Sequence, residues 1–248
     1  MLKKERHNFI IKQINLRNKV LLTELSEKLG VSEDTVRRDL TELADEGKLI
    51  KVHGGALSKS YHLSSMSDGI YALNEKKAVA WKAAKLIKDG MNVLTGGGTT
   101  VIETIKNIPL SVKATLFTIS PLVALELANH NNLQVILIGG RFSRDARVTM
   151  GSQVTNYLSE IRVDICFLGA NDLSAETGVT DSDIEAVQLK KSMIASANKL
   201  VILAISERLK SENRIRVCDN TQIHTLITEL EPTDEILKGF DQAGIKIL

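Results

Sequence analysis

The stretch "VSEDTVRRDLTELADEGKLIKVHGGA", which runs from Val31 to Ala56, has the pattern of one amphipathic helix followed by a strand and a tight turn. Ser32 is a residue type that caps helix N-termini, and Gly47 is suited to end the helix. The apolar positions of this helix recur at i, i+4 and i+7, within an arc of roughly 60°, and are Val36, Leu40 and Leu43. One face of the helix is therefore predicted to be buried, and the opposite face is charged.

The segment just before it, "LLTELSEKLG", predicts a second short helix that begins with Thr23 as its N-cap and ends at Gly30. Two short helices joined by "GVS" predict a helix-turn-helix. The following "KLIKVHGGA" predicts a strand, a glycine turn and a basic edge, which together would form a wing. Spacing alone is also compatible with a plain helical hairpin that has a solvated charged face.

The predicted second helix and the wing carry residue types that contact DNA. The candidates are Ser32, Thr35, Arg37 and Arg38 on the helix, and Lys51 and His53 on the wing. Arg is the usual bidentate reader of guanine in the major groove, and Ser and Thr contact bases or phosphates. The formal net charge of +2 does not indicate nucleic acid, but residues 1–19 hold six Lys or Arg against one acid.

The same stretch closely resembles the DNA-binding signature of DeoR-type bacterial repressors. That signature reads V-S-x-x-T-I-R-R-D-L, then L-x-x-x-G-x-L, then a basic residue before H-G-G-A. The matching positions are Val31, Ser32, Thr35, Arg37, Arg38, Asp39, Leu40, Leu43, Gly47, Leu49, His53, Gly54, Gly55 and Ala56. The resemblance implies a winged helix-turn-helix that binds double-stranded operator DNA, and it disfavours the plain hairpin.

The rest of the chain alternates between short apolar segments and helical segments. The predicted strands are "MNVL", "ATLFT", "LQVILIG", "VDICFLGA", "LVILAI" and "HTLIT", and the predicted helices include "NEKKAVAWKAAKLIKD", "TTVIETIKNI", "PLVALELANH", "QVTNYLSEI" and "DIEAVQLKKSMIASAN". This alternation predicts a mostly parallel sheet covered on both faces. The expected domains are residues 1–57 for DNA binding, a Ser-rich linker at 58–73, and an α/β domain at 74–248 for effector binding and oligomerisation.

Within the α/β domain, "LTGGGTTVIE" at residues 94–103 joins a predicted strand to a predicted helix through three glycines. Backbone N–H groups in a tight turn, hydroxyl groups and a helix N-terminus together favour binding of an anion such as phosphate. The alternative is a turn whose glycines serve only close packing of the strand against the helix.

Residues from about 74 to the end resemble the DeoR effector-binding domain, whose fold is shared with ribose-5-phosphate isomerase. "GTT", "GGR", "LGA" and the helix "DIEAVQLKKSMI" match family segments whose positions hold phosphorylated sugars. The resemblance implies an effector site made of Gly97, Gly98, Thr99, Thr100, Arg141, Asp172, Glu185, Lys190 and Arg208.

Four polar positions of the family pattern are different in this chain. Gly96, Ile119, Asn171 and Ile205 stand where the family usually has an acid, an Asn, an Asp and an Asp. Groups that suit an anion remain, but carboxylates and amides that would bond sugar hydroxyls are lost. A less hydroxylated or differently shaped phosphorylated ligand is therefore expected.

Two other functions are compatible with the residues. One is an α/β domain that only oligomerises, since the four departures are also what a disused pocket would show. A sugar-phosphate isomerase is more remote: Asp172, Asp181, Asp183 and Glu185 are available carboxylates, but an enzyme has no evident use for a DNA reader. The expectation is a transcriptional regulator, most simply a repressor, with no catalytic residues.

Composition and the remaining residue types narrow the other expectations. No segment has the ~18–20 apolar residues of a membrane helix, and charges interrupt the N-terminal apolar run, so a cytoplasmic protein without a membrane partner is expected. Cys166 and Cys218 are predicted packing residues, and no metal site or cofactor is expected. A homo-oligomer, dimer or tetramer, is expected because one winged helix reads only a short half-site.

Overall fold

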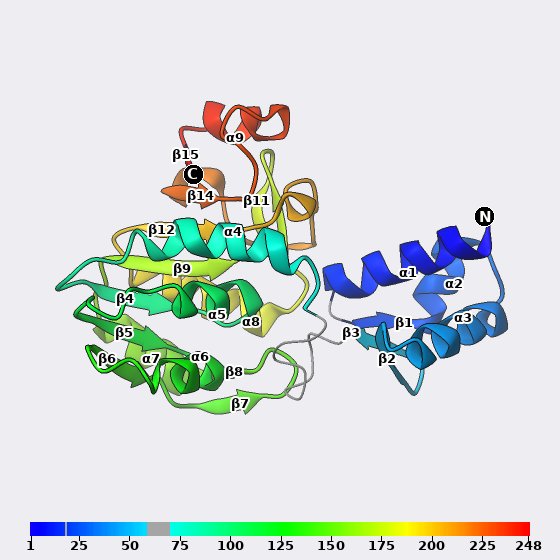
Figure 1. The fold of residues 1–248 in the computed structure, drawn as a ribbon, viewed down its shortest axis with the longest axis horizontal. Helices are drawn as coiled ribbons and strands as arrows, with labels where there is room; N and C mark the ends of the chain where they lie inside the picture. The colour runs from blue at the N-terminus through cyan, green and yellow to red at the C-terminus, as the bar shows by residue number, and fades with distance from the viewer. Residues whose placement is uncertain (18, 59–69) are drawn as a thin grey trace. The chain divides into compact units, whose positions relative to one another are not determined.

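The computed structural model describes residues 1–17, 19–58 and 70–248, and these divide into two compact units, residues 1–72 and 73–248 (Figure 1). Most of the predicted linker, residues 59–69, lies outside the described residues. Each unit is described by itself. None of the helices within the described ranges has the length and apolar character required to cross a membrane.

The first unit contains a helix-turn-helix and a small antiparallel sheet. Its elements are α1 (Lys3–Arg17), β1 (Lys19–Leu21), α2 (Leu22–Leu29), α3 (Glu33–Asp45), β2 (Leu49–Val52) and β3 (Gly55–Ser58). The strands pair in the order β1-β3-β2, and the turn between β2 and β3 forms the predicted wing. Sequence reasoning missed α1 and β1, because charged residues interrupt the apolar pattern of α1.

Local sequence explains where the two helices of this motif begin and end. Ser32 caps α3 as predicted, because its Oγ accepts a hydrogen bond from the Thr35 N–H. Gly30 ends α2 in the left-handed conformation, with a φ of 62°. The prediction that Thr23 caps α2 is wrong: the N-cap is Leu21, because β1 runs directly into the helix and places Thr23 in the first turn.

One apolar core holds the first unit together. The predicted buried face of α3 is confirmed, and α1 supplies the residues that it packs against. The buried side chains of this core are Ile10, Ile14, Val20, Leu22, Leu25, Leu29, Val36, Leu40, Leu43, Leu49 and Ala56. The opposite face of α3 is thereby left to solvent.

The second unit is built on a seven-stranded parallel sheet with the order β15-β14-β12-β9-β4-β5-β6 (Figure 1). Its strands are β4 (Asn92–Thr95), β5 (Ala114–Thr118), β6 (Leu133–Leu137), β9 (Ile165–Gly169), β12 (Leu200–Leu203), β14 (Thr225–Ile227) and β15 (Lys246–Ile247). The mostly parallel sheet predicted from the sequence is confirmed, and six of the strands contain the apolar segments named above.

Helices cover both faces of this sheet. They are α4 (Leu73–Ala84), α5 (Thr99–Lys106), α6 (Pro121–Leu127), α7 (Ser152–Glu160), α8 (Ile184–Ala195) and the short α9 (Lys238–Gln242). Helices α4, α5 and α6 lie on one face, and α7 and α8 pack on the other (Figure 1). Each buried strand is therefore apolar on both sides, which explains the continuous apolar runs in the sequence.

Two small antiparallel sheets were not predicted. One is the hairpin of β7 (Arg141–Ser143) and β8 (Val148–Met150). The other has the order β10-β11-β13 and consists of β10 (Asp172–Ser174), β11 (Gly178–Asp181) and β13 (Ile215–Cys218). Their segments lack the continuous apolar runs by which the strands of the large sheet were predicted. Both sheets carry candidate site residues.

Candidate DNA interface and anion site

The exposed face of α3 carries the residues that the sequence predicted for DNA contact. Arg37 and Arg38 are exposed in the middle of the helix, while Ser32 and Thr35 lie at its N-terminus. The Ser32 and Thr35 hydroxyls are 2.9 Å apart, so this pair is held in place by the cap of the helix. The N-terminal half of α3 thus presents hydroxyl and guanidinium groups side by side on a rigid element.

The two arginines differ in their surroundings. Arg37 Nη1 donates to Asp34 Oδ1 at 2.7 Å, and both side chains are exposed. Within the described residues Arg38 makes no ion pair or side-chain hydrogen bond. Asp34 was not predicted as a site residue. Its carboxylate holds one nitrogen of Arg37 and leaves the rest of the guanidinium for a ligand.

The wing is tied to α3 through Lys51. Lys51 Nζ donates to Thr41 Oγ1 at 2.6 Å, and Thr41 Oγ1 donates to the Arg37 carbonyl at 2.8 Å. His53 is exposed in the turn between β2 and β3. The sequence placed Lys51 and His53 on the wing, and the structure brings Lys51 to the same face of α3 as Thr41.

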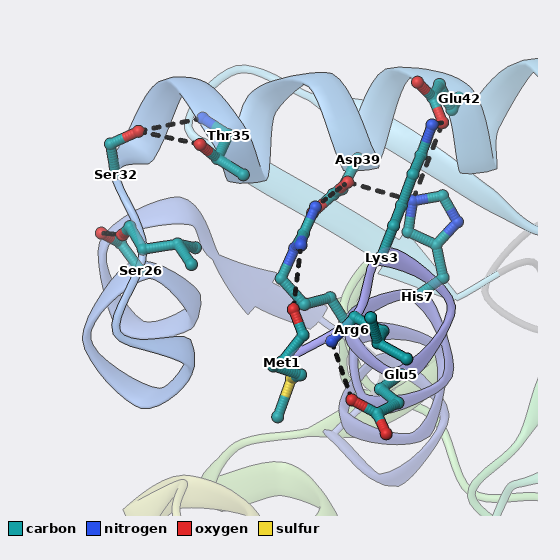
Figure 2. Close-up of polar contacts among 12 residues, drawn as sticks. Met1, Lys3, Glu5, Arg6, His7, Ser26, Ser32, Thr35, Asp39 and Glu42 are labelled. Atoms are coloured by element: carbon teal, nitrogen blue, oxygen red, sulfur yellow. Dashed lines mark hydrogen bonds and ion pairs between the residues drawn. The ribbon is translucent and has the colours of Figure 1, made fainter.

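Asp39 directly follows Arg37 and Arg38 in the sequence. Unlike these two exposed arginines it is buried, with only 2% of its surface accessible. Arg6 donates to both carboxylate oxygens, from Nε at 2.8 Å and from Nη2 at 3.1 Å, and His7 Nε2 lies 3.1 Å from Oδ1 (Figure 2). Burial by itself would raise the pKa of Asp39, but the hydrogen bonds from Arg6 and His7 outweigh it, so the pKa is lowered. Asp39 is therefore an ionised carboxylate held inside the unit.

In the second unit, the predicted effector residues gather near one edge of the sheet. Because β4, β5, β6, β9 and β12 are parallel, their carboxyl ends lie at the same edge (Figure 1). The segments after these strands contain Gly97 and Gly98, Arg141, Asp172 and Arg208. This is the edge where ligands of open α/β sheets bind.

The glycines of the predicted cradle have separate roles. A Cβ built on Gly97 would lie 2.7 Å from Val148 Cγ1, so Gly97 is required for close packing. Gly98 is the N-cap of α5, with a φ of 106° that side-chain-bearing residues rarely adopt, and a Cβ there would meet nothing within 4 Å. Gly97 therefore serves close packing, and Gly98 serves the positive φ at the start of α5.

The start of α5 has the features of an anion site. Gly98 has no side chain that could cap the helix, so the first N–H groups of α5 lack the partner that Ser32 provides in α3. Thr99 and Thr100 are the first two residues of α5 and are half-buried. Uncapped N–H groups, two hydroxyls and the positive end of the helix dipole favour a bound anion at this point.

The two cations predicted to complete the site each pair with an acid. Lys190 Nζ donates to Asp181 Oδ2 at 2.6 Å, and Arg141 Nη2 donates to Glu185 Oε1. Burial would raise the pKa of Asp181, but the Lys190 ammonium and the backbone N–H groups of residues 182 and 183 hold it below the ordinary value. Asp181 was considered from the sequence as a carboxylate available to an isomerase, not as the partner of Lys190. The cap of α8 is Asp183, which accepts from the N–H groups of Glu185 and Ala186.

Arg208 contacts Asn171, and Asp172 is the next residue along the chain. Arg208 is buried, and its Nη1 donates to the Asn171 carbonyl at 3.2 Å. Asp172 begins β10 and accepts a hydrogen bond from Asn213 Nδ2 at 3.3 Å. Neither Asn171 nor Asn213 was predicted as a site residue, because their contacts depend on the missed sheet of β10, β11 and β13.

Of the four departures from the family pattern, Ile119 and Ile205 are core residues, 3% and 4% exposed. Gly96 is buried, and a Cβ there would lie 3.3 Å from Leu168 Cδ2. Asn171 is exposed. Apolar atoms therefore occupy three of the positions where polar side chains were expected, which limits the hydrogen bonds that the site offers to hydroxyl groups.

Neither the cysteines nor the acidic side chains form a metal centre in the part of the chain that the structure describes. Cys166 and Cys218 are buried free thiols, and burial raises the pKa of Cys218 to about 11. Both cysteines therefore remain protonated packing residues at neutral pH.

The ion pair of Lys190 with Asp181 makes a prediction for acid stability. Because the pKa of Asp181 is lowered in the folded state, the ion pair adds to the free energy of unfolding at pH values above the ordinary aspartate pKa of about 3.9. This stabilisation is lost as the pH falls through the lower pKa of the folded state. Lys190→Met should lower the free energy of unfolding by roughly 3 kcal/mol at neutral pH. It should also shift the midpoint of acid unfolding, followed by circular dichroism, to higher pH. Lys191→Met removes an exposed lysine from the same helix and should leave both unchanged; an identical effect of the two variants would contradict the pairing.

Comparison with known proteins identifies both units. The DeoR-like helix-turn-helix domain model matches residues 6–61, and the DeoR C-terminal sensor domain model matches residues 72–230. The chain belongs to the DeoR family of transcriptional regulators. In this DeoR-family regulator, the two matched regions contain all of the candidate DNA-contact residues and all of the candidate effector residues.

Relatives that span the whole length of the chain carry regulatory names. The HTH-type transcriptional regulator GolR of Listeria innocua is 31% identical, covering 98% of this chain and 97% of the relative. The HTH-type transcriptional repressor GlcR of Bacillus subtilis is 30% identical, covering 100% of this chain and 96% of the relative. The lactose phosphotransferase system repressor of Streptococcus mutans is 29% identical over 96% of each. These relatives are named as regulators or repressors, so the isomerase alternative is dropped and the DeoR-family chain is not an enzyme.

Solved structures resemble this chain more distantly. Ribose 5-phosphate isomerase A from Methanocaldococcus jannaschii aligns with a TM-score of 0.42 and 21% identity, covering 56% of this chain and 55% of that chain. A likeness at this level carries no conclusion about activity.

Proposed function

We propose that this DeoR-family protein is a repressor that binds operator DNA through α3 and the wing and senses a phosphorylated small molecule in its α/β unit. Such a protein acts on the chromosome, which places it in the cytoplasm. The observation that carries the sensing part is the uncapped N-terminus of α5, where Gly98, Thr99 and Thr100 leave N–H groups and hydroxyls for an anion. The exposed pair Arg37 and Arg38 supports the DNA-binding part.

The effector that fits this site carries a phosphate and few hydroxyl partners. The proposed contacts are the N–H groups and hydroxyls of Thr99 and Thr100, with Arg141, Lys190 and Arg208 supplying positive charge and Asp172 and Glu185 available to a hydroxyl. Because Lys190 and Arg141 pair with Asp181 and Glu185, ligand binding must compete with these carboxylates. A phosphate on the effector provides the charge for that competition.

The same ion pairs also favour a second candidate function. If Asp181 and Glu185 keep the two cations fully neutralised, the α/β unit binds no effector and only assembles the protein. The test is a thermal-shift screen of the full chain against phosphorylated sugars, smaller phosphates and the unphosphorylated sugars. Stabilisation by phosphorylated compounds alone supports sensing, and a flat screen supports assembly alone. Hits are then added to a DNA-binding titration, where a change in affinity is expected.

Assembly itself is a further part of the proposal. A winged helix reads a short half-site, so specific affinity requires two readers, and the larger α/β unit is the proposed source of the contact. Its exposed apolar side chains include Trp81, Leu110, Leu125, Phe142 and Ile184. A fragment of residues 70–248 should sediment above monomer mass at micromolar concentration in analytical ultracentrifugation, while residues 1–58 should sediment as a monomer. A monomeric 70–248 fragment alongside a dimeric full chain would contradict this assignment.

A further inference from the structure

A ladder of charged side chains joins α1 to α3. Besides the contacts of Arg6 and His7 with Asp39, one turn further along α3 Lys3 Nζ lies 2.5 Å from Glu42 Oε2, and His7 Nε2 lies 3.8 Å from the same oxygen (Figure 2). Two acids on α3 therefore face three basic side chains of α1. Two of the six Lys or Arg counted in residues 1–19, Lys3 and Arg6, thus form ion pairs within the unit.

The inner part of this ladder is not placed to contact DNA. Only 14% of the Arg6 side chain and 13% of the His7 side chain are exposed, and both side chains point to the buried carboxylate of Asp39 on α3. Bidentate binding by Arg6 uses two of its nitrogens and fixes both oxygens of Asp39. A carboxylate held at both oxygens cannot turn about its own axis, so the contact specifies orientation as well as distance.

The position of Asp39 in the sequence links this contact to the DNA-reading face. At about 100° per residue, Asp39 points about 100° away from Arg38 and about 200° away from Arg37 around α3. A rotation of α3 by about 10° would move a side-chain tip, about 6 Å from the helix axis, by about 1 Å. Bidentate hydrogen bonds to a base edge do not tolerate such a shift, because hydrogen bonds weaken steeply outside their narrow range of distance and angle. Apolar packing alone specifies the rotation less sharply, since cores accept small rearrangements.

We infer that Asp39 and Arg6 are positioning residues, which fix the rotation of α3 so that Arg37 and Arg38 meet the base edges without touching DNA themselves. This inference rests on the proposed role of α3 as the DNA reader. It assigns to α1 a part in sequence discrimination, and it explains why an acid directly follows two arginines in a helix that approaches a polyanion.

The test uses the full chain and two variants. Asp39→Asn keeps the shape of the side chain and removes its charge, and Arg6→Lys keeps the charge and removes the fork that binds both oxygens. Glu235→Gln is the control, because it removes one negative charge from an exposed ion pair of the second unit. The DNA probes are a duplex obtained by in vitro selection with the wild-type protein and a scrambled duplex of the same length and composition. Fluorescence anisotropy at several salt concentrations gives Kd and the salt slope, and circular dichroism gives the folded fraction.

Positioning predicts that both variants, while fully folded, bind the selected duplex at least about tenfold more weakly, which corresponds to about 1.4 kcal/mol. Binding to the scrambled duplex and the salt slope should stay within about twofold of wild type, and Glu235→Gln should change neither. Equal weakening on both duplexes with a smaller salt slope would overturn the inference, since Arg6 would then contact phosphate. Unchanged affinity, or a loss that follows only the unfolded fraction, would overturn it as well. If Asp39→Asn does not fold, Arg6→Lys decides.

The inference and the proposed function fail in different ways. If α3 does not read DNA, the double variant Arg37→Ala, Arg38→Ala binds the selected duplex like wild type, and the proposed function fails with the inference. If the double variant loses specific binding but Arg6→Lys keeps it, only the positioning role is wrong.

Discussion

Replacing Arg37 and Arg38 together by Ala is expected to weaken binding to the selected duplex at least about a hundredfold, because each specific Arg contact to a base contributes roughly 1–3 kcal/mol. Both side chains are exposed on α3, so their removal leaves the core of the first unit intact. The melting temperature should therefore remain near that of wild type. Anisotropy titrations of the selected and scrambled duplexes measure the effect.

The single variants distinguish the roles of the two arginines. Loss of a base contact relaxes the preference at one position of the duplex, whereas loss of a phosphate contact weakens all sequences alike and lowers the salt slope by about 1. Arg214→Ala with Arg216→Ala is the matched control, since it removes two exposed arginines from the second unit. A double variant at Arg37 and Arg38 that binds as tightly as this control would refute the assignment of α3.

Gly98→Val is expected to abolish the response to phosphorylated effectors while DNA binding persists. The side chain would enter the space at the start of α5, where a Cβ meets nothing within 4 Å and where the anion is proposed to lie. The change also strains the backbone, because the φ of Gly98 is 106°, and such a conformation costs a non-Gly residue roughly 1–3 kcal/mol. A lower melting temperature with a folded protein is thus expected, together with loss of the ligand-induced thermal shift.

Gly90 supplies the control for backbone strain. It also has a positive φ, 78°, and open space around its Cβ, but it precedes β4 and so lies at the amino end of the strand, away from α5. Gly90→Val should lower the melting temperature to a similar extent and leave the effector response intact. If folded Gly98→Val still responds to the same phosphorylated compound, the start of α5 is not the binding site.

Much of the architecture could be predicted from residue patterns. The helix-turn-helix, the wing and the parallel sheet follow from periodicity, capping residues and apolar runs, because these signals act over a few neighbouring residues. The cap of α3 by Ser32 is one example. The first unit's α1 escaped prediction because its buried Ile10 and Ile14 follow a charged run, in which Lys3 and Arg6 pair with acids of α3.

The candidate sites could be predicted by residue type but not by partner. Sequence reasoning proposed Arg141 and Lys190 as cations for an anion and did not foresee that Glu185 and Asp181 would pair with them. Arg141 and Glu185 are 44 positions apart, and the contact of Lys190 with Asp181 depends on the missed strand β11. Likewise it treated the glycine run as one feature, whereas Gly97 serves packing against Val148 and Gly98 serves the positive φ.

Asp39 shows, within a single helix, the same difference between what neighbouring residues predict and what tertiary packing decides. Its place in the R-R-D sequence and its presence on α3 follow from residues close along the chain. Its bidentate contact comes from Arg6, which is 33 positions earlier, and its lowered pKa comes from Arg6 together with His7. Local patterns determine which elements form, because a helix or strand depends on near neighbours. The function of a charged side chain is decided only when distant segments pack together. Its burial and the nearest opposite charge then determine whether it binds a ligand or pairs with another residue of the protein.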